Sequence, residues 1–249
     1  MTANRERILR EMGLGPVWKL RATPATVPVE AVAELVPAAE LLREAAPAIA
    51  PGVPVSPMAP LATLAWDELA ATVAACRQCR LCEARKQAVL GVGDVNADWL
   101  FVGEGPGAEE DQRGEPFVGQ AGKLLDNMLA AIGLKRGEGV YIANAVKCRP
   151  PENRTPAPEE AAACRPYLER QIELIRPKLI VALGRPAAQT LLQTEIKIAA
   201  ARGKLHDYRG IPLIVTYHPA YLLRTLADKA KAWEDLCFMR RTMAAQRGG

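Results

Sequence analysis

The sequence predicts an α/β fold in which a four-stranded, mainly parallel sheet carries helices on both faces. Four short apolar runs are expected to form the strands, at 98–103, 140–146, 178–183 and 211–217. Helical patterns separate and follow them, at 121–133, 158–175, 186–193 and 228–246. The first run lacks the polar alternation of a half-exposed strand, which indicates burial on both faces. Because strands that alternate with helices pair in parallel through right-handed crossovers, the helices are expected to cover both faces.

The segment ahead of this alternation divides into two parts. Residues 1–20 place apolar residues at helical spacing among charged ones, which predicts a short amphipathic helix. Residues 21–62 are expected to form an Ala- and Pro-rich linker, because nine of the chain's twenty prolines fall in the first sixty residues. The apolar face of the helix can pack on the body of the protein or dock onto a protein partner. The folded domain that carries the functional sites is expected over 63–249.

Composition and charge restrict the class of protein. The 249 residues contain no apolar run near the length of a membrane span, and the start of the chain alternates charged with apolar residues where a signal peptide would be continuously apolar. We therefore expect a globular, cytoplasmic protein without a membrane partner. The net charge of +4 is a small basic excess, which is compatible with a polyanionic partner but does not indicate one.

The cysteines follow a pattern typical of a metal centre. Six cysteines in a cytoplasmic protein are more often metal ligands, catalytic groups or core residues than disulfides. Cys76 and Cys79 form a C-x-x-C pair, and Cys148 and Cys164 stand at the two ends of a proline-rich loop. Two close and two remote thiols can surround zinc or an iron–sulfur cluster, and the spacing does not choose between them. Either group would be structural, and Cys82 is interpreted as a bystander packed on a helix.

Side chains of mixed chemistry follow the predicted strands. Glu104, Glu110 and Phe117 lie in a glycine-rich loop after the first strand. Asn144 ends the second strand and His218 ends the fourth. Ligands of open α/β sheets bind outside the carboxyl ends of the strands, so these side chains are expected to converge. An amide complements the edge of a pyrimidine such as uracil, an aromatic ring stacks on a base, and histidine can donate to a base oxygen. The set predicts a nucleobase site.

At these residues the chain resembles the family 4 uracil-DNA glycosylases, from about Thr72 to Arg224. The resemblance rests on C-x-x-C-x-L, GEGPGxxEDxxGxPFVGxAG, NAVKCRPPENRTP, the helix that contains Cys164, and HPAYLLR. It implies an enzyme that excises uracil from DNA by cleaving the N-glycosidic bond and leaves an abasic site. It also implies a structural [4Fe-4S] cluster, with the ligands Cys76, Cys79, Cys148 and Cys164.

The resemblance assigns the catalytic roles to Glu104 and His218. Glu104 and Gly105 would line the water and sugar side of the site, and His218 would support the departing base. The best-known branch of the superfamily has an aspartate at the place of Gly105, so this chain lacks a strong general base. Catalysis can instead rest on hydrogen bonds to the leaving uracil, if the glycosidic bond breaks before water attacks.

The same resemblance assigns the base-binding roles. Phe117 would stack on uracil and Asn144 would read its edge. Glu110 would crowd the C5 position of the base and so help to reject thymine, which carries a methyl group there.

DNA contacts are expected from Leu222, Leu223, Arg224 and Arg149. A leucine can fill the gap that a flipped base leaves in the duplex, and an arginine can hold the backbone phosphate. Since both leucines could instead begin a helix and face the core, at most one of them is expected to be the wedge. A different class of function is a non-catalytic iron–sulfur module that binds nucleic acid with the same fold.

Overall fold

The computed structural model describes residues 61–247, which belong to one compact unit of the chain. The amphipathic helix predicted over 1–20 lies outside the described residues, and so does the 21–62 linker apart from its last two residues. Both therefore stay predictions. None of the described helices is both long and apolar enough to cross a membrane.

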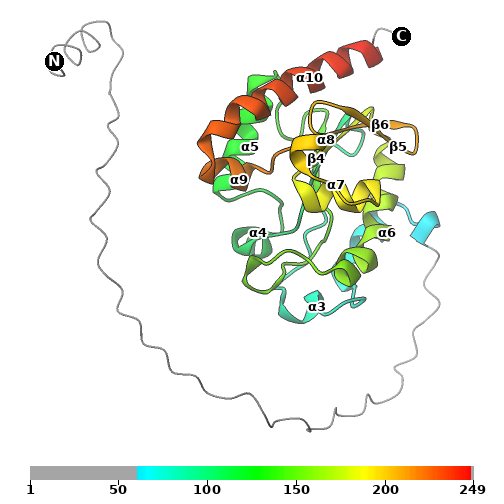
Figure 1. Cartoon of the computed structure of the whole chain (residues 1–249). Coiled ribbons are helices and arrows are strands. Elements are labelled where there is room, and N and C mark those ends of the chain that lie inside the picture. Colours follow the sequence, from blue (N-terminus) through cyan, green and yellow to red (C-terminus); the bar gives the residue numbers. More distant parts are fainter. Residues whose placement is uncertain (1–60, 248–249) are drawn as a thin grey trace, which may run out of the picture. The chain divides into compact units, whose positions relative to one another are not determined.

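The centre of the fold is a six-stranded sheet (Figure 1). Its four inner strands are β2 (Trp99–Gly103), β3 (Val140–Asn144), β4 (Leu179–Leu183) and β6 (Ile211–Thr216). They pair in parallel, and Gly103 lies opposite Asn144 at the carboxyl end of the β2–β3 pair. The predicted α/β class and its four parallel strands are confirmed.

The prediction of four strands is wrong in number, because two short strands complete the sheet. β1 (Val92–Gly93) pairs with β3 and β5 (Leu205–Tyr208) pairs with β6, both antiparallel, which gives the order β1-β3-β2-β4-β6-β5. β1 has two residues, and Leu205 and Asp207 of β5 are exposed. Neither strand therefore shows the apolar run by which an inner strand is recognised in a sequence.

Helices cover both faces of the sheet, as predicted. One face packs against α5 (Gln120–Ala131), α9 (Pro219–Arg224) and α10 (Lys229–Arg247). The other packs against α6 (Pro158–Ile175), α7 (Arg185–Leu192) and α8 (Ile198–Ala201), and Figure 1 shows these two groups on opposite sides of the strands. Successive residues of β2 point to opposite faces, with Phe101 in the first core and Val102 in the second.

A third, smaller core lies beside the sheet and includes two of the predicted ligands. Residues of η1 (Leu61–Thr63), α2 (Trp66–Ala75) and α3 (Leu81–Ala84) pack there with Cys148 and Cys164. The C-x-x-C pair lies outside the helices, because α2 ends at Ala75 and Cys76 has a non-helical backbone, with φ −59° and ψ 136°. The pair therefore lies in the bend between α2 and α3.

Candidate active site

A cleft of about 920 Å³ opens at the carboxyl ends of the four parallel strands. Residues that end or directly follow each of these strands line its walls, as expected for a ligand site in an open α/β sheet. The predicted site residues that line this cleft are Glu104, Gly105, Glu110, Phe117, Asn144, His218 and Arg224. The structure thus brings together the residues predicted for catalysis and for base binding.

Asn144 lines this cleft and carries a buried polar atom that is not satisfied. Its side chain is 2% exposed, and its Oδ1 atom has no hydrogen-bond partner within the described residues. Buried polar atoms are almost always paired, because an unpaired one costs about 1–3 kcal/mol. A buried acceptor on the wall of a cleft is therefore a group prepared for a hydrogen-bond donor on a ligand.

Phe117 is held in an unusual backbone conformation. Its φ of 56° lies in the left-handed region, which a non-glycine residue adopts at a cost. Arg136 compensates by donating from Nη1 to the carbonyl oxygen of Pro116 and from Nη2 to that of Phe117, each at 2.9 Å. Gly122 allows the close approach, since a Cβ atom there would lie 1.7 Å from the Phe117 carbonyl oxygen. Sequence reasoning missed Arg136, which looks like any surface arginine.

The ring of Phe117 stands beside the other two base-site residues. Its centroid lies 5.4 Å from that of the His218 ring, with 30° between the ring planes. A Cβ atom at Gly103 would lie 2.4 Å from Asn144 Oδ1 and 2.6 Å from Phe117 Cζ. Gly103 therefore leaves the space that the amide and the ring occupy.

The His218 ring accepts a hydrogen bond at one nitrogen and has a lowered pKa. Its Nδ1 accepts a hydrogen bond of 3.1 Å from the backbone N–H of Ala220. Burial lowers the pKa of the ring to about 4, with a further contribution from the charge of Arg224, while Glu110 acts in the opposite direction. At neutral pH the ring therefore has one N–H, on Nε2, which is a hydrogen-bond donor available to a ligand.

Glu104 occupies the wall directly after β2. Burial raises the pKa of its carboxyl group, and this effect exceeds the opposing effects of the Thr155 hydrogen bond and the Arg185 charge. All three residues line the same cleft. A carboxylate in this place can orient a water molecule or stabilise a developing positive charge.

Glu110 is held by three backbone amides. Its Oε1 accepts from Val118 and Gly119 at 2.9 and 3.1 Å, and its Oε2 accepts from Gly107 at 3.1 Å. Gly107 is the N-cap of α4 (Ala108–Arg113), so the carboxylate joins the start of this helix to the loop after Phe117. The side chain is a fixed part of the cleft wall.

The four residues predicted to contact DNA differ in their exposure. Leu222 is 1% exposed and lies in the core beneath α9, so the prediction that it contacts DNA is corrected. Leu223 is 42% exposed, and Arg224 is exposed at the edge of the cleft. Arg149 is half-buried and is not itself a lining residue, but its Nε donates at 2.8 Å to Oδ1 of Asn153, which lines the cleft. The rotation of α9 about its axis determines which of the two leucines faces the core, and the sequence alone did not determine it.

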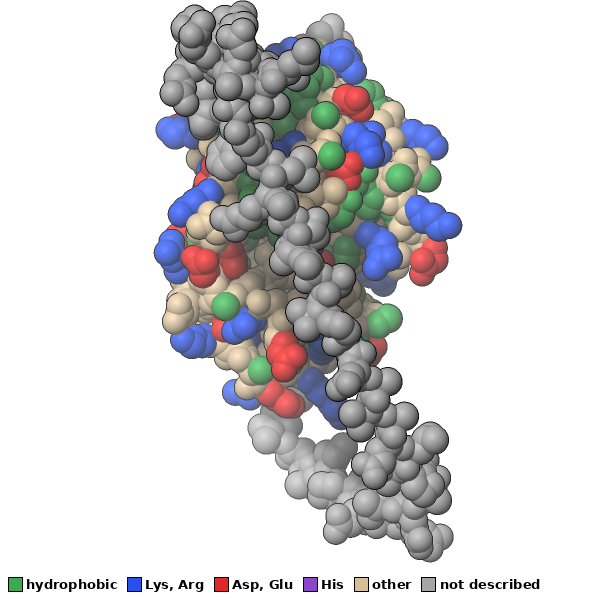
Figure 2. Space-filling view, turned by 60° about the vertical axis from the view of Figure 1, so that its left-hand side comes forward, with side chains coloured by type: hydrophobic (Ala, Val, Ile, Leu, Met, Phe, Trp, Pro, Cys, Tyr) green, Lys and Arg blue, Asp and Glu red, His purple; other side chains and the backbone are tan. Residues whose placement is uncertain are grey.

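The face of the molecule in Figure 2 carries charges of both signs. On the visible part of the face in Figure 2, Lys and Arg side chains are interspersed with Asp and Glu rather than gathered in one basic patch. Contact with a phosphate backbone would therefore depend on individual arginines at the cleft, such as Arg224, more than on a broad positive field.

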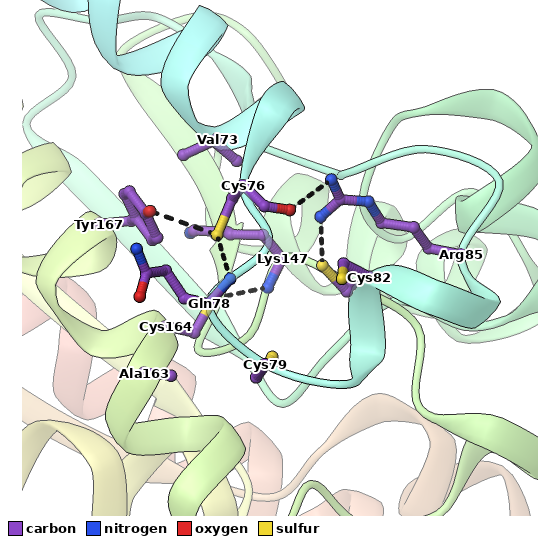
Figure 3. Close-up of a pocket in the computed structure, with 11 residues that line it drawn as sticks. Val73, Cys76, Gln78, Cys79, Cys82, Arg85, Lys147, Ala163, Cys164 and Tyr167 are labelled. Carbon is purple, nitrogen blue, oxygen red and sulfur yellow. Dashed lines mark hydrogen bonds between the residues drawn. The ribbon is translucent and has the colours of Figure 1, made fainter. Parts of the chain in front are cut away.

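A second cavity is lined by five cysteine side chains (Figure 3). They are Cys76, Cys79, Cys82, Cys148 and Cys164. Hydrogen-bond donors point at several of the sulfur atoms: Arg85 Nη1 lies 2.7 Å from Cys148 Sγ, and Tyr167 Oη lies 3.2 Å from Cys76 Sγ. The backbone N–H of Lys147 donates to Cys164 Sγ at 3.2 Å. Sequence reasoning missed these donors, since each lies far along the chain from the thiol or gives no local pattern.

The chemistry of this cavity fits a thiolate-bound group. Burial raises the pKa of Cys148 and that of Cys79, and it raises the pKa of Cys164 to about 12. Free thiols here would stay protonated, whereas a bound metal centre deprotonates its cysteine ligands and donors of N–H and O–H stabilise the thiolates. The described thiols do not by themselves form a closed group of three at metal-binding distances, so the set of four ligands stays a prediction. Cys82 lines the same cavity, so its position does not distinguish it from the four predicted ligands.

An amide, an aromatic ring and an imidazole meet in one cleft at the carboxyl ends of the parallel strands, which is the arrangement expected of an α/β protein that binds a nucleobase. The match to a family model agrees with this class. The model of the Uracil DNA glycosylase superfamily matches residues 90–237, and the chain belongs to this superfamily.

Within the superfamily the chain is similar to proteins named Type-4 uracil-DNA glycosylase. It is 48% identical over 165 residues to the one from Archaeoglobus fulgidus, which covers 63% of this chain and 82% of the relative. It is 47% identical over 161 residues to the one from Thermotoga maritima, covering 64% and 83%. To the one from Pyrobaculum aerophilum it is 42% identical over 177 residues, covering 68% and 90%.

Proposed function

We propose that the protein is a DNA repair enzyme that hydrolyses the N-glycosidic bond of uracil in DNA, releasing uracil and leaving an abasic site. The single observation that carries the proposal is the buried amide of Asn144, whose Oδ1 lacks a partner within the described residues and lies on the cleft wall. Uracil has an N3–H donor next to the O4 acceptor, which complements an amide oxygen and amino group. Phe117 stacks on the base that is read in this way.

Catalysis follows from hydrogen bonds to the departing base. When the C1′–N1 bond breaks, its electron pair goes to uracil and the sugar becomes positively charged. The neutral His218 donates from Nε2 to a uracil oxygen and stabilises the anion, without an earlier proton transfer. Glu104 stabilises the cationic sugar and orients the water that adds to C1′, and the proton that this water loses neutralises the departing uracil anion. Gly105 lines the same cleft beside Glu104.

Rejection of thymine is assigned to Glu110. Because three backbone amides hold its carboxylate, this part of the wall cannot move aside for a methyl group without losing hydrogen bonds. The methyl group that thymine carries on C5 would point at this wall, and the fixed carboxylate would therefore exclude it.

The base must leave the duplex before it reaches the cleft. Flipping costs a few kcal/mol of stacking and pairing, which a side chain inserted in the gap offsets. We assign this wedge to Leu223, which is exposed where Leu222 is buried, and the phosphate contacts to Arg224 and Arg149. DNA that contains uracil, single- or double-stranded, is the proposed partner.

We assign a [4Fe-4S] cluster to the cavity of Figure 3, with Cys76, Cys79, Cys148 and Cys164 as ligands. When bound, the cluster supplies cross-links between the turn after α2 and the chain from β3 to α6. The residues around it add the donors described above, from Arg85, Lys147 and Tyr167. Reduced thiols and a DNA substrate both favour a cytoplasmic location. A protein partner for residues 1–20 stays a prediction.

A glycosylase assay tests the proposal. Purified protein should convert a uracil-containing oligonucleotide into an alkali-labile abasic product without added cofactor, and leave the matched thymine oligonucleotide intact. Asn144→Ala should abolish most of the product while DNA binding persists. Tight binding by the unchanged protein with no product would refute the enzyme and favour a non-catalytic nucleic-acid-binding module.

A further inference from the structure

Lys147 is a fully buried lysine that has no acidic partner among the described residues. It follows β3, and its side chain is 1% exposed. Its Nζ donates to the backbone carbonyl oxygen of Asn144 at 2.8 Å and to Gln171 Oε1. Both acceptors are uncharged, and within residues 61–247 no Asp or Glu forms an ion pair with Lys147. Burying an ammonium group without a nearby anion is costly, so its presence calls for a compensating negative charge.

The cysteine cavity supplies that charge. Lys147 lines this cavity, and Figure 3 shows its side chain among the cysteines. It directly precedes Cys148, and its own backbone N–H donates to Cys164 Sγ. Four thiolates around an iron–sulfur core leave a net negative charge on the group, and fixed positive charges close to such a group shift its reduction potential. One buried cation thus lies beside the assigned anionic group.

The same ammonium holds the end of the strand that carries Asn144. Its bond to the Asn144 carbonyl fixes the residue whose side chain lies on the wall of the active-site cleft. Gln171 extends the connection, since its Nε2 donates to the Leu90 carbonyl at 3.0 Å and to Tyr141 Oη at 3.4 Å. The network joins α6, the end of β3 and the segment before β1. Every other residue in it is uncharged.

We propose that Lys147 is a positioning residue with two roles: it balances the charge of the thiolate group, and it holds the carboxyl end of β3 so that Asn144 meets the base. The inference rests on the proposed glycosylase activity and cluster. Lys147 connects the two sites, whose linings have no residue in common within the described part of the chain. Loss of the ammonium should therefore change both a property of the cluster and the rate of excision.

Two neutral variants separate the roles. Lys147→Met removes the charge and the hydrogen-bond donor, whereas Lys147→Gln removes the charge but keeps a donor. Lys178→Met is the matched control, since Lys178 is a half-exposed lysine just before β4 whose Nζ pairs with Asp98 at 3.1 Å. Iron content, melting temperature, the reduction potential of the cluster and single-turnover excision are measured on the full chain. If Lys147→Met does not fold, Lys147→Gln decides the charge role by itself.

Both Lys147 variants should have a more negative reduction potential than the wild type, because a nearby cation favours the reduced, more negative cluster. Excision should fall at least tenfold in Lys147→Met and less than threefold in Lys147→Gln, and Lys178→Met should match the wild type in both. Unchanged potentials, or Lys147→Met excision within twofold of wild type at full iron content, would overturn the inference. A wild-type protein without iron or without excision would instead refute the proposed function.

Discussion

Replacement of Gly103 by alanine should inactivate the base site while the protein stays folded. The new Cβ atom would lie 2.4 Å from Asn144 Oδ1 and 2.6 Å from Phe117 Cζ. Ordinary contacts between such atoms are about 3.5 Å, so the amide oxygen and the ring must each move about 1 Å away from the new atom. A displacement of about 1 Å between reacting or positioning groups reduces catalysis about 100-fold. Overpacking costs about 1–3 kcal/mol, which lowers the melting temperature by several degrees without unfolding the protein.

Single-turnover excision of uracil from an oligonucleotide measures the loss, with circular dichroism for the fold. Gly133→Ala is a matched control, because an added Cβ meets nothing within 4 Å there, although the φ of +77° strains an alanine. It should cost about 1 kcal/mol of stability and leave excision unchanged. Wild-type excision by Gly103→Ala would show that Asn144 and Phe117 do not bind the base.

Three further predictions follow from the site. Since the pKa of His218 is about 4 in the folded protein and its ordinary value is 6.5, protonation of this group should cause no loss of excision between pH 8 and 5. The contribution of the group to stability is complete above pH 6.5 and should decline as the pH falls to 4. A limb of the pH–rate profile at 6.5 that disappears in His218→Ala would contradict the lowered pKa. Leu223→Ala should slow excision from duplex DNA by a factor at least fivefold larger than the factor for single-stranded DNA. Leu222→Ala should instead lower the melting temperature and affect both substrates alike. Equal behaviour of the two variants would exclude Leu223 as the wedge. Cys164→Ala should abolish the visible absorbance and iron of the purified protein, and Cys82→Ala should retain both; loss of iron from the Cys82 variant would change the assigned ligand set.

The inner sheet could be predicted from the sequence because its strands are buried on both faces. Their apolar runs are unbroken and end abruptly, and the rule that ligands bind at the carboxyl ends of strands then places Glu104, Asn144 and His218 together. The edge strands escape such reasoning, since β1 and β5 are short and partly exposed. Burial on both faces gives the inner strands a recognisable apolar pattern, and its absence leaves β1 and β5 without one.

The supporting contacts of the site could not be predicted, for a different reason. Arg136 holds Phe117 from 19 residues away, and Gln171 receives Lys147 from 24 residues away. A charged or polar residue in a helix or turn normally faces water, so its sequence context gives no sign of a buried partner. Which of Leu222 and Leu223 faces the core depends on the rotation of α9 against α5, which is set by packing between distant segments.

The two antiparallel end strands have a consequence for how the protein behaves in concentrated solution. A parallel sheet that ended at β3 and β6 would expose long rows of unpaired backbone groups, on which another chain could add a strand. Here one border is a two-residue strand, and the other is a four-residue strand that carries a charged, exposed Asp207. Such borders give a neighbouring chain too short a template for stable pairing. The fold therefore resists edge-to-edge association between copies of the chain.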